Sequence, residues 1–131
     1  MALVRVLLAE DHAALLLEIR EHLCKEFDIV GSVADGVQAV DAVRLLDPDV
    51  LVIDISMPVM DGLEAAKILR DAHCRTKIVI LTISEQAEYI SAAFAVGASA
   101  YVTKRRLSTE LIPAIQEVLQ GRTFLSASLR I

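Results

Sequence analysis

Short apolar segments rich in β-branched residues alternate along this chain with longer amphipathic segments, and this alternation constrains the fold more than any other feature. A parallel strand buried on both faces has a nearly continuous apolar sequence, and helices join successive parallel strands. The segments that predict strands are residues 5–9, 28–33, 50–54, 77–82 and 100–103. We therefore expect an α/β protein whose parallel sheet carries helices on both faces.

The intervening segments place apolar residues at helical spacing. These segments are residues 12–27, 36–46, 61–73, 85–97 and 108–121. In the second of them, Val37, Val40 and Val43 are expected to share the face that packs on the sheet. Strands and helices in strict alternation predict a (βα)₅ arrangement with right-handed crossovers.

Length and charge narrow the class of protein. A chain of 131 residues matches one domain and can bury a core without disulfides or structural metals. The formal net charge of −5 provides no global attraction for nucleic acid or an anionic membrane. Cys24 and Cys74 are far apart, which predicts reduced thiols. The apolar N-terminal stretch is interrupted by Arg5 and is too short for a signal peptide or a membrane helix, so we expect a cytoplasmic protein.

Charged and polar side chains follow the predicted strands where each one ends. Glu10 and Asp11 follow the first strand, Asp54 ends the third, Thr82 ends the fourth and Lys104 follows the fifth. The carboxyl ends of parallel strands meet at one edge of the sheet, so these groups are expected to converge. Three carboxylates in one place repel one another unless a cation lies among them. A site of oxygen ligands that stays open to phosphate fits Mg²⁺.

A carboxylate beside a divalent cation, a lysine and a hydroxyl can accept a phosphoryl group. In this hypothesis Asp54 attacks phosphorus, Mg²⁺ and Lys104 neutralise charge on the transferring group, and Thr82 donates a hydrogen bond to a phosphoryl oxygen. The product is a labile mixed anhydride, which suits a reversible switch better than a store of phosphate.

These residues occur in the order and at the spacing of a known family. The segments that carry the resemblance are Glu10-Asp11, DISMPVMDG from Asp54, LTIS around Thr82 and GASAYVTK ending at Lys104. Over residues 3–122 the chain resembles the receiver domain of two-component response regulators, a flavodoxin-like doubly wound fold with strand order 2-1-3-4-5. The segments AEDH, DGLEAAKILR and GRTFLS resemble the NarL/FixJ subgroup, in which a LuxR-type helix-turn-helix that binds DNA follows the receiver.

The resemblance implies a role for each matched residue. Asp54 would be phosphorylated by a sensor histidine kinase. Asp11, Asp54 and the backbone carbonyl of Ser56 would bind Mg²⁺, with Glu10 acting largely through water. Thr82 and Tyr101 would form the switch: when phosphate draws the Thr82 hydroxyl inward, the aromatic ring enters the space it leaves. This population shift would reshape the face made by the fourth helix, fifth strand and fifth helix.

The resemblance also implies an organisation for the whole protein. Residues 1–122 would be the receiver domain, and residues 123–131 would begin a linker to an effector domain that this chain does not contain. The module would form a homodimer on phosphorylation, bind DNA only through the missing domain and have no membrane partner. It would be no enzyme beyond catalysing its own phosphorylation and dephosphorylation.

Four positions depart from the family pattern or bear on an open question. Glu10 replaces the aspartate often found there, which lengthens one arm of the metal site. Arg105 stands where many receivers have proline, and the sequence leaves the isomer of the bond between Lys104 and Arg105 undecided. Ser56 and Ser84 are small, and we hypothesise that they leave water room to hydrolyse the phosphoryl group quickly.

Three other functions would each require a different sequence feature. A stand-alone receiver that docks on proteins differs from a transcription regulator by lacking a following helix-turn-helix domain of about 60 to 70 residues. A magnesium-dependent phosphohydrolase of the haloacid-dehalogenase kind needs a second aspartate where this chain has Ser56. A flavin- or nucleotide-binding protein needs a phosphate-cradling loop after the first strand, but AEDHAALL is acidic there. His12, beside the acidic pair, is expected to point outward rather than to bind metal.

Overall fold

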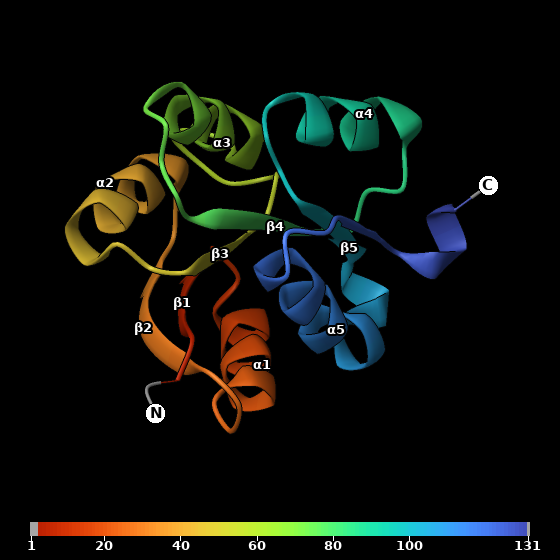
Figure 1. Cartoon of the computed structure of the whole chain (residues 1–131), viewed down its shortest axis with the longest axis horizontal. Helices are drawn as coiled ribbons and strands as arrows, with labels where there is room; N and C mark the ends of the chain where they lie inside the picture. The colour runs from red at the N-terminus through yellow and green to blue at the C-terminus, as the bar shows by residue number, and fades with distance from the viewer. Residues whose placement is uncertain (1–2, 131) are drawn as a thin grey trace.

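The computed structural model describes residues 3–130 and contains one parallel sheet covered by helices (Figure 1). The strand order is β2-β1-β3-β4-β5-β6, and every neighbouring pair is parallel. The strands are β1 (Arg5–Ala9), β2 (Asp28–Val33), β3 (Val50–Ile53), β4 (Lys77–Thr82), β5 (Ala100–Thr103) and β6 (Phe124–Leu125). The first five strands confirm the flavodoxin-like order 2-1-3-4-5.

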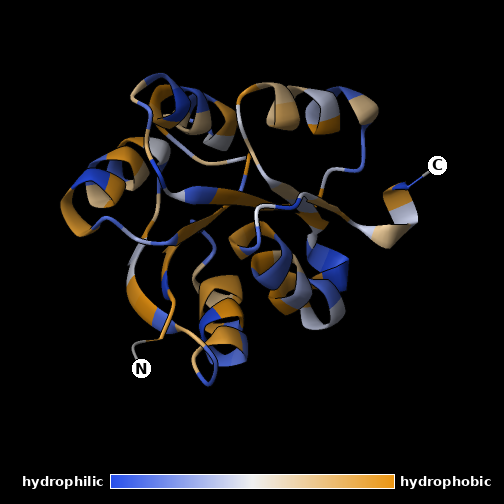
Figure 2. Ribbon diagram, viewed as in Figure 1, coloured by the Kyte–Doolittle hydropathy of each residue, from blue (hydrophilic) through white to orange (hydrophobic). Residues whose placement is uncertain are grey.

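The helices form a layer on each face of the sheet (Figure 1). One layer contains α1 (Ala13–Leu23) and α5 (Leu107–Leu119), and the other contains α2 (Gly36–Leu46), α3 (Gly62–Asp71) and α4 (Ala87–Ala95). The central strands are largely apolar (Figure 2), because their alternate side chains enter two separate cores. Leu8 packs in the core under α1 and α5, whereas its neighbour Leu7 packs under α2 and α3.

The local pattern of α2 departs from our expectation at one position. Asp35 caps the helix by accepting a hydrogen bond from the Gln38 backbone N–H. Val40 and Val43 are buried as expected, but Val37 lies at the edge of the stripe and is 40% exposed. The prediction that Val37 faces the core is therefore wrong, and the buried residues of α2 are Gly36, Ala39, Val40 and Val43.

The residues after α5 form a sixth strand, which the sequence did not predict. We expected residues 123–131 to lie outside the repeating pattern, yet β6 pairs with β5 through the register Ala100↔Phe124 and Tyr101↔Leu125. Gly121 has φ 79°, which lets the chain turn back toward the sheet after α5. A short 3₁₀ helix, Ala127–Leu129, follows β6. The role of residues 123–131 as the start of a linker stays a prediction.

The peptide bond after Lys104 and the character of the helices both bear on questions raised by the sequence. All peptide bonds between the described residues are trans, which includes the bond between Lys104 and Arg105 within the 3₁₀ helix Lys104–Arg106. Across residues 3–130, no helix combines the length and the apolar character that crossing a membrane requires. The cytoplasmic localisation stays a prediction.

Candidate functional site

The polar groups predicted from the strand ends lie together at the carboxyl edge of the sheet. Glu10 and Asp11 follow β1, Asp54 follows β3 and Lys104 follows β5. A pocket of about 190 Å³ opens at this edge. Its lining residues are Asp11, His12, Asp54, Ser56, Ile83 and Lys104. The topology therefore brings the predicted acidic groups and the lysine to one place.

Three carboxylates form the acidic part of the site. One oxygen of each of Glu10, Asp11 and Asp54 lies within 4.8 Å of the others. Glu10 is 3% exposed and Asp54 is 5% exposed, whereas Asp11 is open to solvent. Water screens two of these charges poorly, so their mutual repulsion is strong unless positive charge offsets it.

Lys104 supplies part of that positive charge. Its Nζ donates a hydrogen bond to Oδ2 of Asp54 at 2.8 Å and lies 2.9 Å from Oε1 of Glu10. The contact with Glu10 is close enough for an ion pair, but its angles are not those of a hydrogen bond. Burial, the largest single influence, lowers the Lys104 pKa, but the hydrogen bonds and charges of Asp54 and Glu10 together raise it above its ordinary value. Lys104 is therefore a stable cation.

The pocket offers oxygen ligands that fit a magnesium ion. Lys104 can offset only one of three carboxylate charges, which leaves the pocket negative. Asp11, Asp54 and Ser56 line it, and an all-oxygen set with room for water is what Mg²⁺ prefers. Glu10 is engaged elsewhere, because its Oε2 accepts the His12 backbone N–H at 3.1 Å and its Oε1 faces Lys104. The role of Glu10 through water stays a prediction.

The rim of the pocket differs from our expectation at one residue. Ser56 lines the pocket, but Ser84 does not, and Ile83 takes that place with 79% of its surface exposed. The hypothesis that Ser84 opens the site to water is therefore not supported by its position. His12 is exposed, as expected, and lies at the rim. Ile83 directly follows Thr82, but no sequence pattern indicates which loop side chain faces the pocket.

The two expected switch residues are both buried beside the site. Thr82 is 2% exposed at the end of β4, and Tyr101 is fully buried on β5. The Tyr101 hydroxyl donates a hydrogen bond to the Ser84 backbone carbonyl at 2.8 Å. Burial raises the pKa of Tyr101, and this effect outweighs the opposite effect of the Ser84 hydrogen bond. Tyr101 thus ties β5 to the loop that follows Thr82.

Glycines allow the loop after Asp54 to fold tightly against the site. The Gly62 N–H donates to the Ile55 carbonyl at 2.8 Å, and a Cβ on Gly62 would lie 2.1 Å from the Asp54 carbonyl oxygen. Asp61 caps α3 by accepting a hydrogen bond from the Glu64 N–H, as its turn-like sequence indicates.

Val59, within the loop after Asp54, has φ 69° and is 82% exposed. A β-branched residue in the left-handed region is strained.

Comparisons with known proteins agree with this geometry. Residues 6–116 match the family model described as the response regulator receiver domain. The chain is 38% identical over 113 residues to the transcriptional regulatory protein PdtaR of Mycobacterium tuberculosis, covering 86% of this chain and 55% of that protein. It is 37% identical over 129 residues to the transcriptional regulatory protein DesR of Bacillus subtilis, covering 97% of this chain and 64% of that protein. The chain thus spans 55% of one of these relatives and 64% of the other.

Solved structures show the same architecture. A two-component response regulator of the LuxR family from Aurantimonas sp. SI85-9A1 has a TM-score of 0.92 and 30% identity, with 98% of this chain and 93% of that chain covered. A second structure is the isolated receiver domain of RcsB from Salmonella enterica serovar Typhimurium, solved in the presence of phosphomimetic BeF₃⁻. It has a TM-score of 0.88 and 26% identity, with 97% of this chain and 96% of that chain covered.

Proposed function

The chain belongs to the response regulator receiver domain family, in the NarL/FixJ subgroup, and we propose that Asp54 is the residue that accepts a phosphoryl group from a sensor histidine kinase. One observation carries this proposal. Lys104 holds Asp54 through a 2.8 Å hydrogen bond, while Asp11 and Glu10 place their carboxylates within 4.8 Å of it. A buried carboxylate held in this way is positioned to act as a nucleophile toward an anion in the pocket.

Each residue has a defined part in the transfer. A carboxylate oxygen of Asp54 forms the new bond to phosphorus while the bond from phosphorus to the donor breaks. Lys104 stays protonated and offsets negative charge on the transferring group, and the Thr82 hydroxyl donates to a phosphoryl oxygen. Asp11, Asp54 and the Ser56 backbone carbonyl would hold Mg²⁺, which supplies further positive charge when bound. The chain would catalyse only its own phosphorylation and dephosphorylation.

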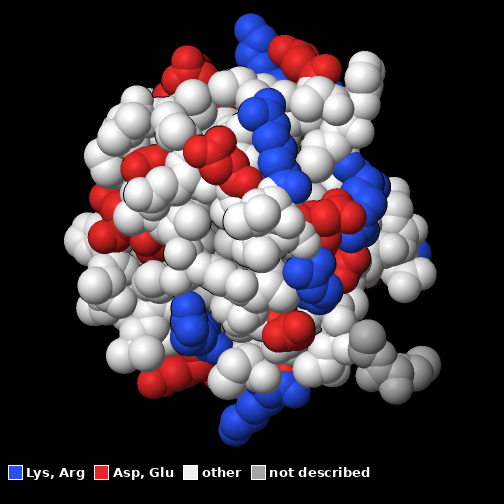
Figure 3. Space-filling model, turned by 90° about the vertical axis from the view of Figure 1, so that its left-hand side faces the viewer, with Lys and Arg blue, Asp and Glu red and all other residues white. Residues whose placement is uncertain are grey.

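We further propose that this module regulates transcription through a domain beyond this chain. The matched relatives are named transcriptional regulatory proteins, and this chain spans 55% to 64% of their length. The chain carries a net charge of −5, and acidic and basic side chains are interspersed over the face seen in Figure 3 without a basic stripe. DNA contact would therefore belong to another domain, and phosphorylation would promote a homodimer. The alternative is a stand-alone receiver that docks on proteins.

A direct test uses the purified chain, Mg²⁺ and acetyl phosphate, with intact mass as the readout. We expect one phosphoryl adduct on the wild type and none on Asp54→Ala. Asp41→Ala is the matched control, because Asp41 is exposed on α2 and away from the pocket. An adduct that persists on Asp54→Ala would exclude Asp54 as the acceptor.

A further inference from the structure

The residues after β5 and α5 return to the strand that carries the switch tyrosine. We call residues 124–129 the C-terminal segment. The Ser126 N–H donates to the Tyr101 carbonyl at 2.9 Å, and the Phe124 N–H donates to the Ser99 carbonyl at 3.0 Å. The Ser126 Oγ accepts the Thr103 N–H at 3.0 Å. The segment therefore bonds to the backbone of Ser99, Tyr101 and Thr103, and Thr103 directly precedes Lys104.

A buried carboxylate fixes this segment in one register. Ser126 is fully buried, and its Oγ donates to Oε1 of Glu110 at 2.6 Å. The Ala127 N–H donates to the other oxygen of Glu110 at 2.9 Å. Glu110 lies on α5 and is only 8% exposed. A carboxylate is costly to bury, and here both of its oxygens are bonded by the C-terminal segment, so undocking the segment would leave Glu110 without these partners.

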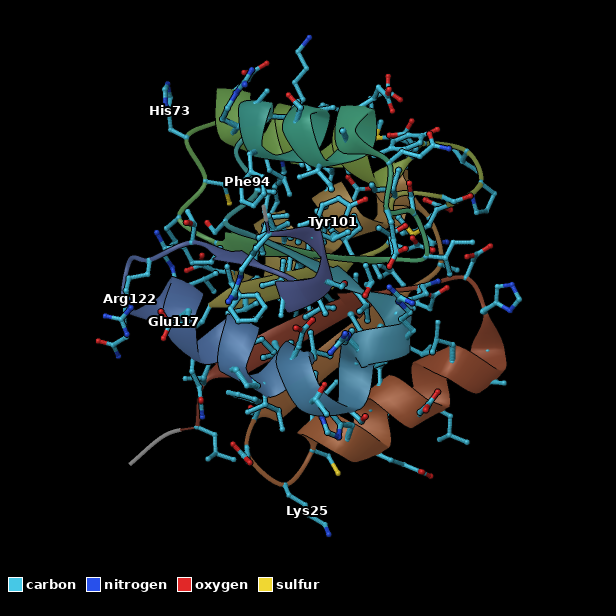
Figure 4. The ribbon with its side chains drawn as sticks, turned by 90° about the vertical axis from the view of Figure 1, so that its right-hand side faces the viewer. Lys25, His73, Phe94, Tyr101, Glu117 and Arg122 are labelled. Atoms are coloured by element: carbon cyan, nitrogen blue, oxygen red, sulfur yellow. The ribbon has the colours of Figure 1, made fainter. Side chains whose placement is uncertain are left out.

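The apolar side chains of the segment seal both cores at the edge of the sheet. Phe124 packs against the core under α5, and Leu125 and Leu129 pack against the core that contains Tyr101. Figure 4 looks onto this edge and shows Tyr101 and Phe94 beneath α4, where the returning chain passes. The buried conformation of Tyr101 and the docked segment thus share one apolar cluster.

We propose that docking of the C-terminal segment is coupled to phosphorylation of Asp54, an inference that rests on the proposed function. Leu125 and Leu129 of the docked segment pack against the core that contains Tyr101, and Ser126 bonds to the backbone of Tyr101 and Thr103. In the switch that the resemblance implies, phosphorylation favours the buried Tyr101 ring, and it would then favour docking as well. Coupling is reciprocal, so docking stabilises the phosphorylated form by the same factor. A change in docking would then pass the phosphorylation state of Asp54 to residues that follow this segment in a longer protein.

Hydrogen exchange of single amides tests this coupling in the wild-type chain. With acetyl phosphate and Mg²⁺, we expect exchange of the Phe124 and Ser126 amides to slow by about three- to tenfold, the range that one net hydrogen bond provides. The Asp28 amide, bonded to the Val4 carbonyl at the opposite edge of the sheet, is the internal control and should not change. Equal slowing at Asp28 would indicate a global effect and overturn the coupling.

Two variants sharpen the test. Ser126→Ala removes the bonds to Glu110 and Thr103, so we expect faster exchange at Thr103 and loss of the phosphorylation-dependent change at Phe124. Ser128→Ala, at an exposed serine of the same segment, should behave as the wild type. A Ser126→Ala chain that fails to fold leaves the wild-type comparison decisive.

The outcomes separate this inference from the proposed function. A wild type that forms the adduct at Asp54 but shows unchanged or faster exchange at Phe124 and Ser126 overturns the coupling and leaves the phosphoacceptor assignment intact. A wild type that forms no adduct overturns the proposed function, and the coupling with it.

Discussion

Val59 stores backbone strain within the loop that follows Asp54, and replacing it with glycine should stabilise the protein. Its φ of 69° lies in the left-handed region, where an L residue pays about 1–2 kcal/mol and a β-branched residue lies at the upper end. The side chain is 82% exposed, so its removal loses only about 0.3 kcal/mol of apolar burial. Glycine also makes the unfolded chain more flexible, which lowers the free energy of unfolding by about 0.4–1 kcal/mol.

The strain term exceeds the two opposing terms, so Val59→Gly should raise the free energy of unfolding by about 0.5–1 kcal/mol. For a chain of this size that corresponds to an increase in Tm of about 2–5 °C. The assay is thermal unfolding followed by circular dichroism, with urea unfolding as a second measure.

Val37→Gly is the matched control for this substitution. Val37 lies in the first turn of α2, where glycine costs a few tenths of a kcal/mol of helix propensity relative to valine, and its side chain is more than half buried, so this variant should be destabilised by at least about 1 kcal/mol. If Val59→Gly is no more stable than the wild type while Val37→Gly behaves as expected, the assignment of strain to Val59 is wrong.

Three other substitutions test the site. Lys104→Met leaves the buried Asp54 and Glu10 charges unpaired. In urea unfolding without divalent cations, it should lower the free energy of unfolding by about 3 kcal/mol, and Mg²⁺ should restore part of this loss. Because the pKa of Tyr101 is raised in the folded protein, its contribution to stability is fully present below the ordinary tyrosine pKa of about 10 and is lost as the pH rises through the folded pKa. Tyr101→Phe should therefore reduce the fall of the unfolding free energy at alkaline pH. Gly62→Ala should be destabilised by at least about 2 kcal/mol because its Cβ meets the Asp54 carbonyl, whereas Gly31→Ala, with side-chain contacts at 3.4 Å, should be tolerated in the same melting experiment.

The layered fold could be predicted because it depends on local patterns. The apolar segments are long enough to identify, and β1, β2, β4 and β5 begin and end at the expected residues. β3 ends at Ile53, one residue early, which places Asp54 in the loop. The sixth strand could not be predicted, because it has two residues and is held by Glu110, 16 positions before Ser126. No periodic pattern reports a contact of that kind.

The site was predictable in composition but not in detail. The carboxylates and Lys104 follow strand ends, and parallel strands bring those ends together. The direction of each side chain depends on loop conformation, which the sequence does not specify. For this reason the sequence did not indicate that Lys104 pairs with Glu10 as well as with Asp54, or that Ile83 rather than Ser84 lines the pocket.

Reductive trapping tests the central claim most directly, because borohydride converts an aspartyl phosphate to homoserine and so marks the acceptor residue. The chain would be treated with acetyl phosphate and Mg²⁺, reduced, digested and mapped by tandem mass spectrometry. Our account predicts homoserine at position 54, dependent on Mg²⁺ and lost when Lys104 is replaced by methionine. Homoserine at Asp11 or at any other position, or none on a chain that carries the phosphoryl mass, would contradict it.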